Sequence, residues 1–102
     1  MFGEATEKVP GGKLVRIKVN FMNLIKDVQI TGDFFLHPEE CVHEIENSLK
    51  NTTIDFQQDE VVNKVNEILK KHNAELIGVH PETIAKTLKT AIENGKVASI
   101  TS

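Results

Sequence analysis

Tryptophan and tyrosine are absent from this chain of 102 residues, and cysteine occurs once, as Cys41. Without the two larger base-stacking aromatics, and with a net charge of -3, the sequence disfavours nucleic-acid binding, which depends on stacking side chains and a basic surface. A single cysteine cannot form an internal disulfide framework, and it is typical of a reducing compartment. We therefore expect neither a nucleic-acid partner nor a disulfide scaffold.

Long apolar runs are missing as well. None approaches the roughly 18 residues of a membrane-spanning helix, and the start, MFGEATEK, lacks the basic and apolar regions of a signal peptide. These absences predict a cytoplasmic protein without a membrane partner. A chain of this length predicts a single domain, residues 1–102, with one modest core and a mobile N-terminus at residues 1–7. A deep active site of its own is not expected.

Charge is spread unevenly along the chain. Residues 8–26 contain five basic residues and no acidic one, whereas residues 27–67 contain ten acidic residues against Lys50 and Lys64. Such asymmetry could steer an anionic partner to one face of the protein. The simpler interpretation, a basic strand ribbon balanced by acidic helices within one fold, is favoured, and both stay open.

Alternating side chains predict strands in the first third of the sequence. Apolar residues take every second position from 15 to 21, as Val15, Ile17, Val19 and Phe21. The alternation resumes at Val28 and Ile30, and a turn centred on Asn23 joins the two strands into an antiparallel hairpin. A break at residues 10–12 allows residues 4–9 to add a third strand. The result is a small antiparallel meander of two to three strands with one apolar face.

Helices are predicted to follow and to cover that face. The motifs HPEE at 37–40 and HPET at 80–83 place proline at the first helical position and an acid in the first turn, where the helix dipole favours it. Apolar stripes at helical spacing predict three helices, at about residues 38–50, 58–72 and 81–94. Gly95 is placed to end the third helix. The predicted fold class is α+β, with about three helices on one face of the sheet.

Side chains that could bind a metal or act as a nucleophile are few. His37, Cys41 and His43 are close in sequence, but His43 would point away from the other two on a helix, so we expect no metal site. Cys41 lies on an apolar stripe, where a thiol is usually buried and inert, and we expect no catalytic residue.

The loop PGGK at 10–13 lacks the remainder of a Walker motif, since Leu14 and a strand follow it. We favour a structural turn here. The alternative is that exposed amides of Gly11 and Gly12, beside Lys13 and Arg16, complete an anion site on a partner.

Four blocks of sequence together resemble a known family. They are KVPGGKLVRIKV, ITGDFFLHPEE, the acidic amphipathic helix after them, and IGVHPETIAKTLKTAI near the end. In this order and spacing they resemble the C-terminal domain of lipoate-protein ligase, in the form made as a separate accessory subunit. The resemblance covers about residues 8–94 and implies an α+β fold, in agreement with the patterns above.

The resemblance also implies a function. That family uses ATP, with Mg²⁺, to activate lipoate to lipoyl-adenylate and transfers the lipoyl group to a lysine of a lipoyl-carrier domain. The arginine-led, glycine-rich lipoate motif of its catalytic domain is missing here. The resemblance therefore implies a non-catalytic accessory subunit that binds no cofactor alone and has a separate catalytic subunit as its partner. The surface expected to face that subunit comprises Gly11, Gly12, Lys13 and the corner Gly32, Asp33, Phe34 and Phe35.

Two other functions remain open from the sequence. A small sheet backed by helices also occurs in sulfur-trafficking and iron-sulfur scaffold domains, although one cysteine is few for such a role. The third possibility is a small protein-interaction or carrier module that forms homodimers through an uncovered sheet face.

Overall fold

The computed structural model describes residues 1–101 and contains eight regular elements in this part of the chain. In chain order they are β1 (Phe2–Lys8), β2 (Leu14–Phe21), β3 (Ile25–Gly32), β4 (Phe35–His37), α1 (Cys41–Leu49), α2 (Gln58–Lys71), β5 (Glu75–Ile77) and α3 (Pro81–Thr101). Strands β1, β2 and β3 form an antiparallel meander, and β4 pairs with β5 in a separate two-stranded ribbon. The predicted α+β class with three helices is confirmed.

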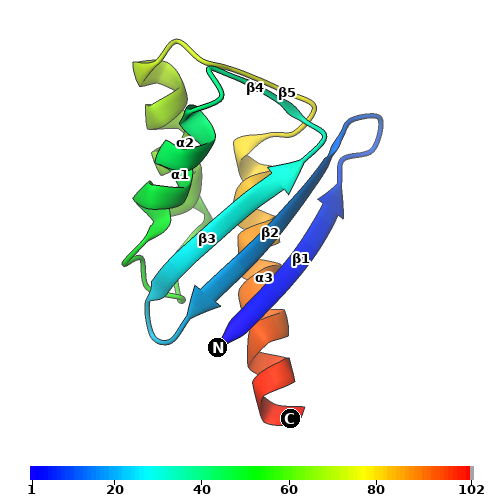
Figure 1. Ribbon diagram of the computed structural model, residues 1–102, viewed down its shortest axis with the longest axis vertical. Helices are drawn as coiled ribbons and strands as arrows, with labels where there is room; N and C mark the ends of the chain where they lie inside the picture. The colour runs from blue at the N-terminus through cyan, green and yellow to red at the C-terminus, as the bar shows by residue number, and fades with distance from the viewer. Residues whose placement is uncertain (102) are drawn as a thin grey trace.

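The predicted hairpin is present, with a turn at residues 22–24 between β2 and β3. Its inward-facing side chains are buried, because α3 packs against β1 and β2 while α1 packs against β3. Figure 1 shows all three helices on one side of the meander, with α3 running behind it and α1 and α2 beside β3. The opposite face of the meander carries no helix among the described residues. The buried apolar side chains form one cluster.

Residues 1–7 were expected to form a mobile N-terminus, and in the structure most of this segment is a paired strand. Phe2–Lys8 forms β1, and the register pairs Phe2 with Asn20 and Lys8 with Leu14. The third strand expected at residues 4–9 therefore exists and begins two residues earlier. The reason is long-range: Gly3 lies directly against the carbonyl of Ala91 on α3, where a Cβ would be 1.8 Å from that oxygen. Local sequence patterns do not reveal such a contact.

Both edges of the meander are partly closed by side chains and loops. On β3, the N–H of Ile30 donates to Oε2 of Glu46 on α1 at 2.7 Å, and the N–H of Ile25 donates to the carbonyl of Thr52 at 2.9 Å. On β1, the side-chain amide of Asn94 on α3 donates to the carbonyl of Glu4 at 2.9 Å. These contacts occupy backbone groups that an added strand would need.

Two predicted helix ends are wrong. α1 begins at Cys41 rather than Pro38, because the N–H groups of Cys41 and Val42 donate three residues back, to Pro38 and Glu39, in a separate turn. α3 runs to Thr101 and passes through Gly95, which was expected to end it. A Cβ at Gly95 would lie 2.7 Å from Cε1 of Phe21, so this glycine permits close packing of the helix on the sheet. α2, at Gln58–Lys71, begins where predicted and ends one residue earlier.

The β4–β5 ribbon was not predicted. Each strand has only three residues, too few to show alternation, and they lie 40 positions apart in the chain (35 and 75). Leu36 and Leu76 pair across the ribbon on its inner face, and Phe35 pairs with Ile77 on its outer face. No helix in residues 1–101 is both long enough and apolar enough to span a bilayer.

Candidate functional site

Three connecting segments meet at one end of the meander, and we call this region the loop corner: residues 10–13, 32–35 and 77–80. The N–H of Lys13 donates to the carbonyl of Gly78 at 2.8 Å. The N–H of Leu14 donates to Oδ1 of Asp33 at 2.8 Å, and the N–H of Asp33 donates back to the carbonyl of Leu14 at 3.3 Å. The two sequence blocks expected to form one surface are therefore brought together, and a third segment joins them.

The glycine loop at residues 10–13 is a hydrogen-bonded turn. The N–H of Gly12 donates to the carbonyl of Val9 at 2.8 Å, and the N–H of Lys13 is held by Gly78. Two amides that a phosphate cradle would require are therefore already used. The hydrogen bond of Gly12 agrees with the first interpretation of this loop, a structural turn. The second interpretation, contact with an anionic group of a partner, now depends on the side chain of Lys13.

The Lys13 side chain is packed at its Cβ and Cγ atoms, and its ammonium group has no partner in the described part of the chain. Gly78 has φ +100°, and a Cβ there would lie 2.4 Å from Cγ of Lys13, so the lysine stem lies flat against the glycine. No hydrogen bond or ion pair to its ammonium group exists within residues 1–101. Lys13 is exposed. An oriented, unpaired cation is suited to binding an anionic group of another molecule.

Phe35 gives the loop corner an apolar centre. Its side chain is 51% exposed, and its register partner Ile77 is 52% exposed. The Phe35 ring stacks on the imidazole of His37, with ring centroids 6.2 Å apart and planes 13° apart. Beside this pair, Phe34 is half-buried against the core. The sequence did not point to Ile77, since its only local signal was an apolar residue directly before Gly78.

An open groove of about 420 Å³ adjoins this apolar centre. Its walls come from the end of β3, from β4 and from the first turns of α1, and they include Ile30, Phe34 and Val42. His37, Glu39 and His43 stand at its margin. The loop corner thus combines exposed apolar area with polar and charged groups around it, the composition of a protein-docking surface.

Arg16 does not belong to the loop corner, although it was grouped with Lys13 from sequence. It lies on the helix-free face of the meander, where Nε donates to Oγ1 of Thr6 at 3.2 Å and lies 3.9 Å from Oε2 of Glu4. The alternation of β2 explains this placement, because even-numbered residues point away from the helices.

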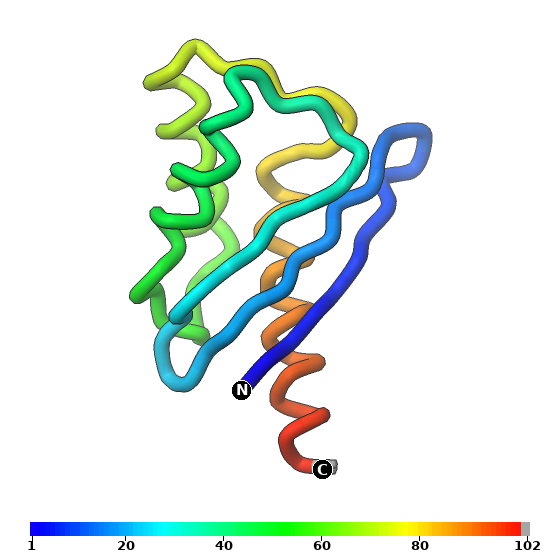
Figure 2. The backbone as a smooth tube through the Cα atoms, viewed as in Figure 1, coloured from blue at the N-terminus to red at the C-terminus, as the bar shows by residue number. Residues whose placement is uncertain are grey.

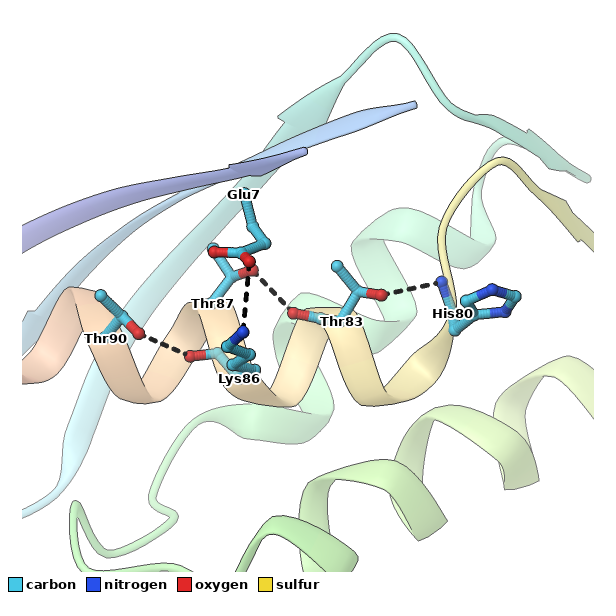
Figure 3. A network of polar contacts seen from close by, with 6 residues as sticks. All are labelled: Glu7, His80, Thr83, Lys86, Thr87 and Thr90. Atoms are coloured by element: carbon cyan, nitrogen blue, oxygen red, sulfur yellow. Dashed lines mark hydrogen bonds and ion pairs between the residues drawn. The ribbon is translucent and has the colours of Figure 1, made fainter. Parts of the chain in front are cut away.

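Two threonine side chains make hydrogen bonds at the start of α3, next to the loop corner. The N–H of His80 donates to Oγ1 of Thr83 at 3.2 Å, and Oγ1 of Thr87 donates to the carbonyl of Thr83 at 2.7 Å. Figure 3 shows this row along α3, with Lys86 reaching Glu7 of β1 at 3.3 Å. Of these contacts, the ion pair between Lys86 and Glu7 is the one that joins α3 to the sheet.

Cys41 is buried, with 1% of its surface exposed. Burial raises the pKa of its thiol, and the carboxylates of Glu44 and Glu40 raise it further, because a thiolate is unfavourable in apolar surroundings and near negative charge. Within residues 1–101, no group of three or more histidine, cysteine or carboxylate side chains is arranged to hold a metal ion. Sulfur-transfer or cluster-scaffold chemistry is therefore disfavoured.

The loop corner lies at one end of a small α+β domain, and residues 1–101 contain no cluster of side chains arranged to hold a metal ion. The sequence matches the family described as "Bacterial lipoate protein ligase C-terminus" over residues 4–88. The chain therefore belongs to this family of lipoate-protein ligase C-terminal domains.

Two relatives from Thermoplasma acidophilum agree with this assignment. "Lipoate-protein ligase A subunit 2" is 32% identical over 80 residues, covering 74% of this chain and 77% of the relative. A chain in the solved structure of an archaeal lipoylation system, a bi-partite lipoate protein ligase and its E2 lipoyl domain, is 26% identical with a TM-score of 0.70. That alignment covers 86% of this chain and 94% of the other.

Proposed function

We propose that this protein is the non-catalytic accessory subunit of a two-chain lipoate-protein ligase and works with a separate catalytic chain. The supporting observation is the family match over residues 4–88, together with a relative that is named as the second subunit of such a ligase. In the complex, lipoate and ATP with Mg²⁺ are the substrates, and this chain alone binds none of them. The proposed setting is the cytoplasm.

The loop corner is the surface proposed to face the catalytic chain. Its exposed Phe35–Ile77 pair supplies the apolar centre that lasting subunit interfaces require. The half-buried Phe34 and the groove beside it provide a recess for an apolar side chain of the partner. Gly11, Gly12, Gly32 and Asp33 shape the backbone around this centre.

Lys13 is proposed to place its ammonium group against an anionic group of the catalytic chain or of its bound nucleotide. The close contact between Gly78 and the aliphatic part of the Lys13 side chain already restricts that side chain. A restricted lysine loses less conformational entropy when it binds an anion. A docked domain can also order mobile loops and exclude water around the reacting groups. Oriented positive charge near a phosphate lowers the barrier to adenylate formation by several kcal/mol when the geometry is tight, on the order of 3 kcal/mol per contact.

The test is reconstitution. The catalytic chain, lipoate and ATP·Mg are mixed with and without this protein, and lipoyl-adenylate is measured. We expect adenylate to form efficiently only with both chains. Equal yields in both mixtures would refute the accessory role, and adenylate formed by this protein alone would refute the non-catalytic assignment.

A second arm tests Lys13. Lys13→Ala is compared with Lys70→Ala, because Lys70 is an exposed lysine on α2 whose ammonium also has no partner within residues 1–101. We expect Lys13→Ala to lower the adenylation rate by about tenfold or more, the loss typical of a charged contact to a phosphate or carboxylate. Lys70→Ala should leave the rate unchanged. Equal adenylation rates for the two variants would show that Lys13 has a structural role in the turn and makes no contact needed for adenylation.

A further inference from the structure

β1 is an edge strand whose outer side is free. It pairs with β2 on one side only, and Figure 2 shows it in dark blue at the outside of the meander, with α3 passing behind it. The other edge strand, β3, packs against α1, and Glu46 of that helix accepts one of its N–H groups. A free edge strand of seven residues presents a row of backbone groups with which another strand can pair. Of the two edges of the meander, β1 is therefore the more open.

The ladder between β1 and β2 determines which backbone groups of β1 face outward. Met1 and Phe21 exchange two hydrogen bonds: the N–H of Phe21 donates to the carbonyl of Met1 at 2.8 Å, and the amino group of Met1 donates to the carbonyl of Phe21 at 2.6 Å. Bonded and non-bonded pairs alternate along an antiparallel ladder. The odd-numbered residues of β1 therefore bond to β2, and the even-numbered residues point their N–H and C=O groups outward.

These outward groups are largely unoccupied. They belong to Phe2, Glu4, Thr6 and Lys8, whose side chains are all exposed. Within residues 1–101, the carbonyl of Glu4 alone among these backbone groups accepts a hydrogen bond, from the side-chain amide of Asn94 at 2.9 Å. A carbonyl oxygen has two lone pairs, so this contact does not prevent a second hydrogen bond. The edge can therefore accept another strand.

A second copy of this chain fits the edge only in certain registers. A two-fold axis places two β1 strands antiparallel, and outward-facing residues must then pair with outward-facing residues. Registers with at least three such pairs place the axis at residue 4, 5 or 6. Each of these registers brings a different set of side chains opposite one another.

Charge distinguishes the three registers. An axis at residue 4 places Glu4 opposite Glu4 of the second copy, and an axis at residue 5 places Lys8 opposite Phe2 of the second copy. An axis at Thr6 places Glu4 opposite Lys8 of the second copy, twice by symmetry, and Thr6 opposite itself. Opposite charges and paired threonines stabilise facing strands, whereas like charges destabilise them. The register about Thr6 is therefore the self-complementary one, and Phe2 lies beyond its paired stretch.

Both charged side chains are available for this pairing. Lys8 has no ion pair within residues 1–101, and its ammonium group contacts only the carbonyl of Gly12, at 3.3 Å. The carboxylate of Glu4 lies 3.9 Å from Nε of Arg16, and Lys18 is opposite Glu4 in the register. Both of these basic residues belong to β2, on one side of Glu4. The other side of Glu4, at the edge of the sheet, is open to a second cation.

We propose that this protein self-associates through β1, which pairs with β1 of a second copy about a two-fold axis at Thr6 and joins the two meanders into one sheet. The paired surface is small, since it comprises one edge strand and its side chains. The dimer is therefore weak, with a Kd on the order of 100 µM. The inference does not depend on the proposed function, because its residues belong to β1 and not to the loop corner.

The first experiment is sedimentation equilibrium of the full chain between about 10 µM and 1 mM, the range of weak association. Glu4→Lys and Lys8→Glu each turn the proposed ion pairs into repulsions. Lys70→Glu is the matched control, because it changes the net charge as Lys8→Glu does but lies at an exposed position of α2. Thermal unfolding of each variant checks that the fold is kept.

We expect Glu4→Lys and Lys8→Glu each to raise the Kd about tenfold or more, because both symmetry-related pairs become repulsive. An equimolar mixture of these two variants should regain wild-type association. In the mixed dimer, the lysine introduced at position 4 faces the glutamate introduced at position 8, and the native Lys8 of one chain faces the native Glu4 of the other. Lys70→Glu should keep the wild-type Kd.

A second experiment tests the backbone and stays informative if Glu4→Lys disturbs β1. Thr6→Pro removes an outward N–H and leaves the ladder to β2 intact, because residue 6 does not donate to β2. Thr6→Ala is the control, since it loses the same hydroxyl contact with Arg16. We expect Thr6→Pro to raise the Kd about tenfold or more, and Thr6→Ala less than about threefold.

Three results would overturn the proposal. The first is a wild-type protein that stays monomeric up to about 1 mM. The second is a dimer whose Kd changes with neither the charge variants nor Thr6→Pro, since it would form through another surface such as the Phe35–Ile77 pair. The third is folded charge variants whose mixture fails to regain association, because that refutes the register about Thr6. None of these results bears on adenylate formation, so the proposed function is tested separately.

Discussion

Gly78 lies directly beneath the side chain of Lys13: its carbonyl accepts the Lys13 N–H at 2.8 Å, and a Cβ at Gly78 would be 2.4 Å from Cγ of the lysine. The contact joins residues 65 positions apart (13 and 78). It makes the direction of an exposed lysine depend on a glycine in another loop. Position 78 requires glycine for two reasons: there is no space for a Cβ atom, and φ is +100°.

We therefore expect Gly78→Ala to lower the free energy of unfolding by about 2–4 kcal/mol, from backbone strain and overlap with Lys13. Gly11→Ala is the matched control, because Gly11 has φ +73° but open space around its Cβ position. It should cost only about 1 kcal/mol. Urea unfolding measures the stability of both variants. Under conditions in which both are fully folded, the rate of adenylate formation should fall in Gly78→Ala and not in Gly11→Ala. Equal losses of stability would show that the Lys13 contact is unimportant.

Exchange of Phe35 or Ile77 for serine should weaken assembly with the catalytic chain and leave this protein's own stability nearly unchanged, because both side chains are already half exposed. Apolar residues at the centre of an interface typically contribute about 2 kcal/mol or more on truncation, or roughly 30-fold in Kd. Met22→Ser is the control, since Met22 is 53% exposed in the turn between β2 and β3, away from the loop corner. Calorimetric titration should show wild-type affinity for that variant. A weaker complex for Met22→Ser alone would move the interface to the other end of the meander.

Gly95→Ala should destabilise the protein even though alanine favours a helix by about 1 kcal/mol over glycine. The added methyl would lie 2.7 Å from Cε1 of Phe21 and 2.9 Å from the carbonyl of Phe2. Such overpacking costs about 1–3 kcal/mol, so the net loss should be about 1 kcal/mol. Thermal unfolding measures it against Glu93→Ala, an exposed site on the same helix. A rise in melting temperature for Gly95→Ala would show that α3 can move away from the sheet.

Glu44 should make stability depend on pH in the acidic range. The side chain of Lys71 and then that of His72 donate hydrogen bonds to its carboxylate and lower its pKa below the ordinary 4.5. A carboxyl with a lower pKa in the folded state stabilises the fold above its unfolded pKa and loses that contribution as the pH falls through the folded pKa.

Glu44→Gln should therefore be less stable than wild type near pH 6, with the difference shrinking below pH 4.5. Glu67→Gln, at an exposed position of α2 with no ion pair in the described residues, should track the wild type throughout. Urea unfolding over this pH range measures the three proteins. A constant difference for Glu44→Gln at all pH values would rule out the ion pair as its cause.

Cys41 should resist alkylation in the native protein, because burial and the carboxylates nearby raise its pKa and only the thiolate reacts. Iodoacetamide labelling near neutral pH should be slow in buffer and fast in urea, as followed by mass spectrometry. Rapid labelling of the native protein would contradict this prediction and show that the Cys41 thiol is reactive.

The sequence was informative where one local pattern decides the structure. β2 was predicted because four alternating apolar residues need a single buried face, and α2 because its stripe repeats at helical spacing over 14 residues. The loop corner was predicted in part, since two of its three segments carry the blocks that resemble the family. Ile77 was missed because its importance depends on pairing with Phe35 across 42 positions (35 and 77).

The amino-acid sequence by itself determined the class of fold, the meander, the existence of three helices and the family. Each strand or helix depends on a pattern within one stretch of chain, and the family depends on the order and spacing of four such stretches. The tertiary structure alone decided that α3 continues through Gly95, that residue 2 already belongs to a strand, that the glycine-loop amides are occupied, and that Arg16 and Lys13 lie on different surfaces. The physical reason is the same in each case. Contacts between distant segments, such as Gly95 with Phe21 and Lys13 with Gly78, fix what local preference leaves free.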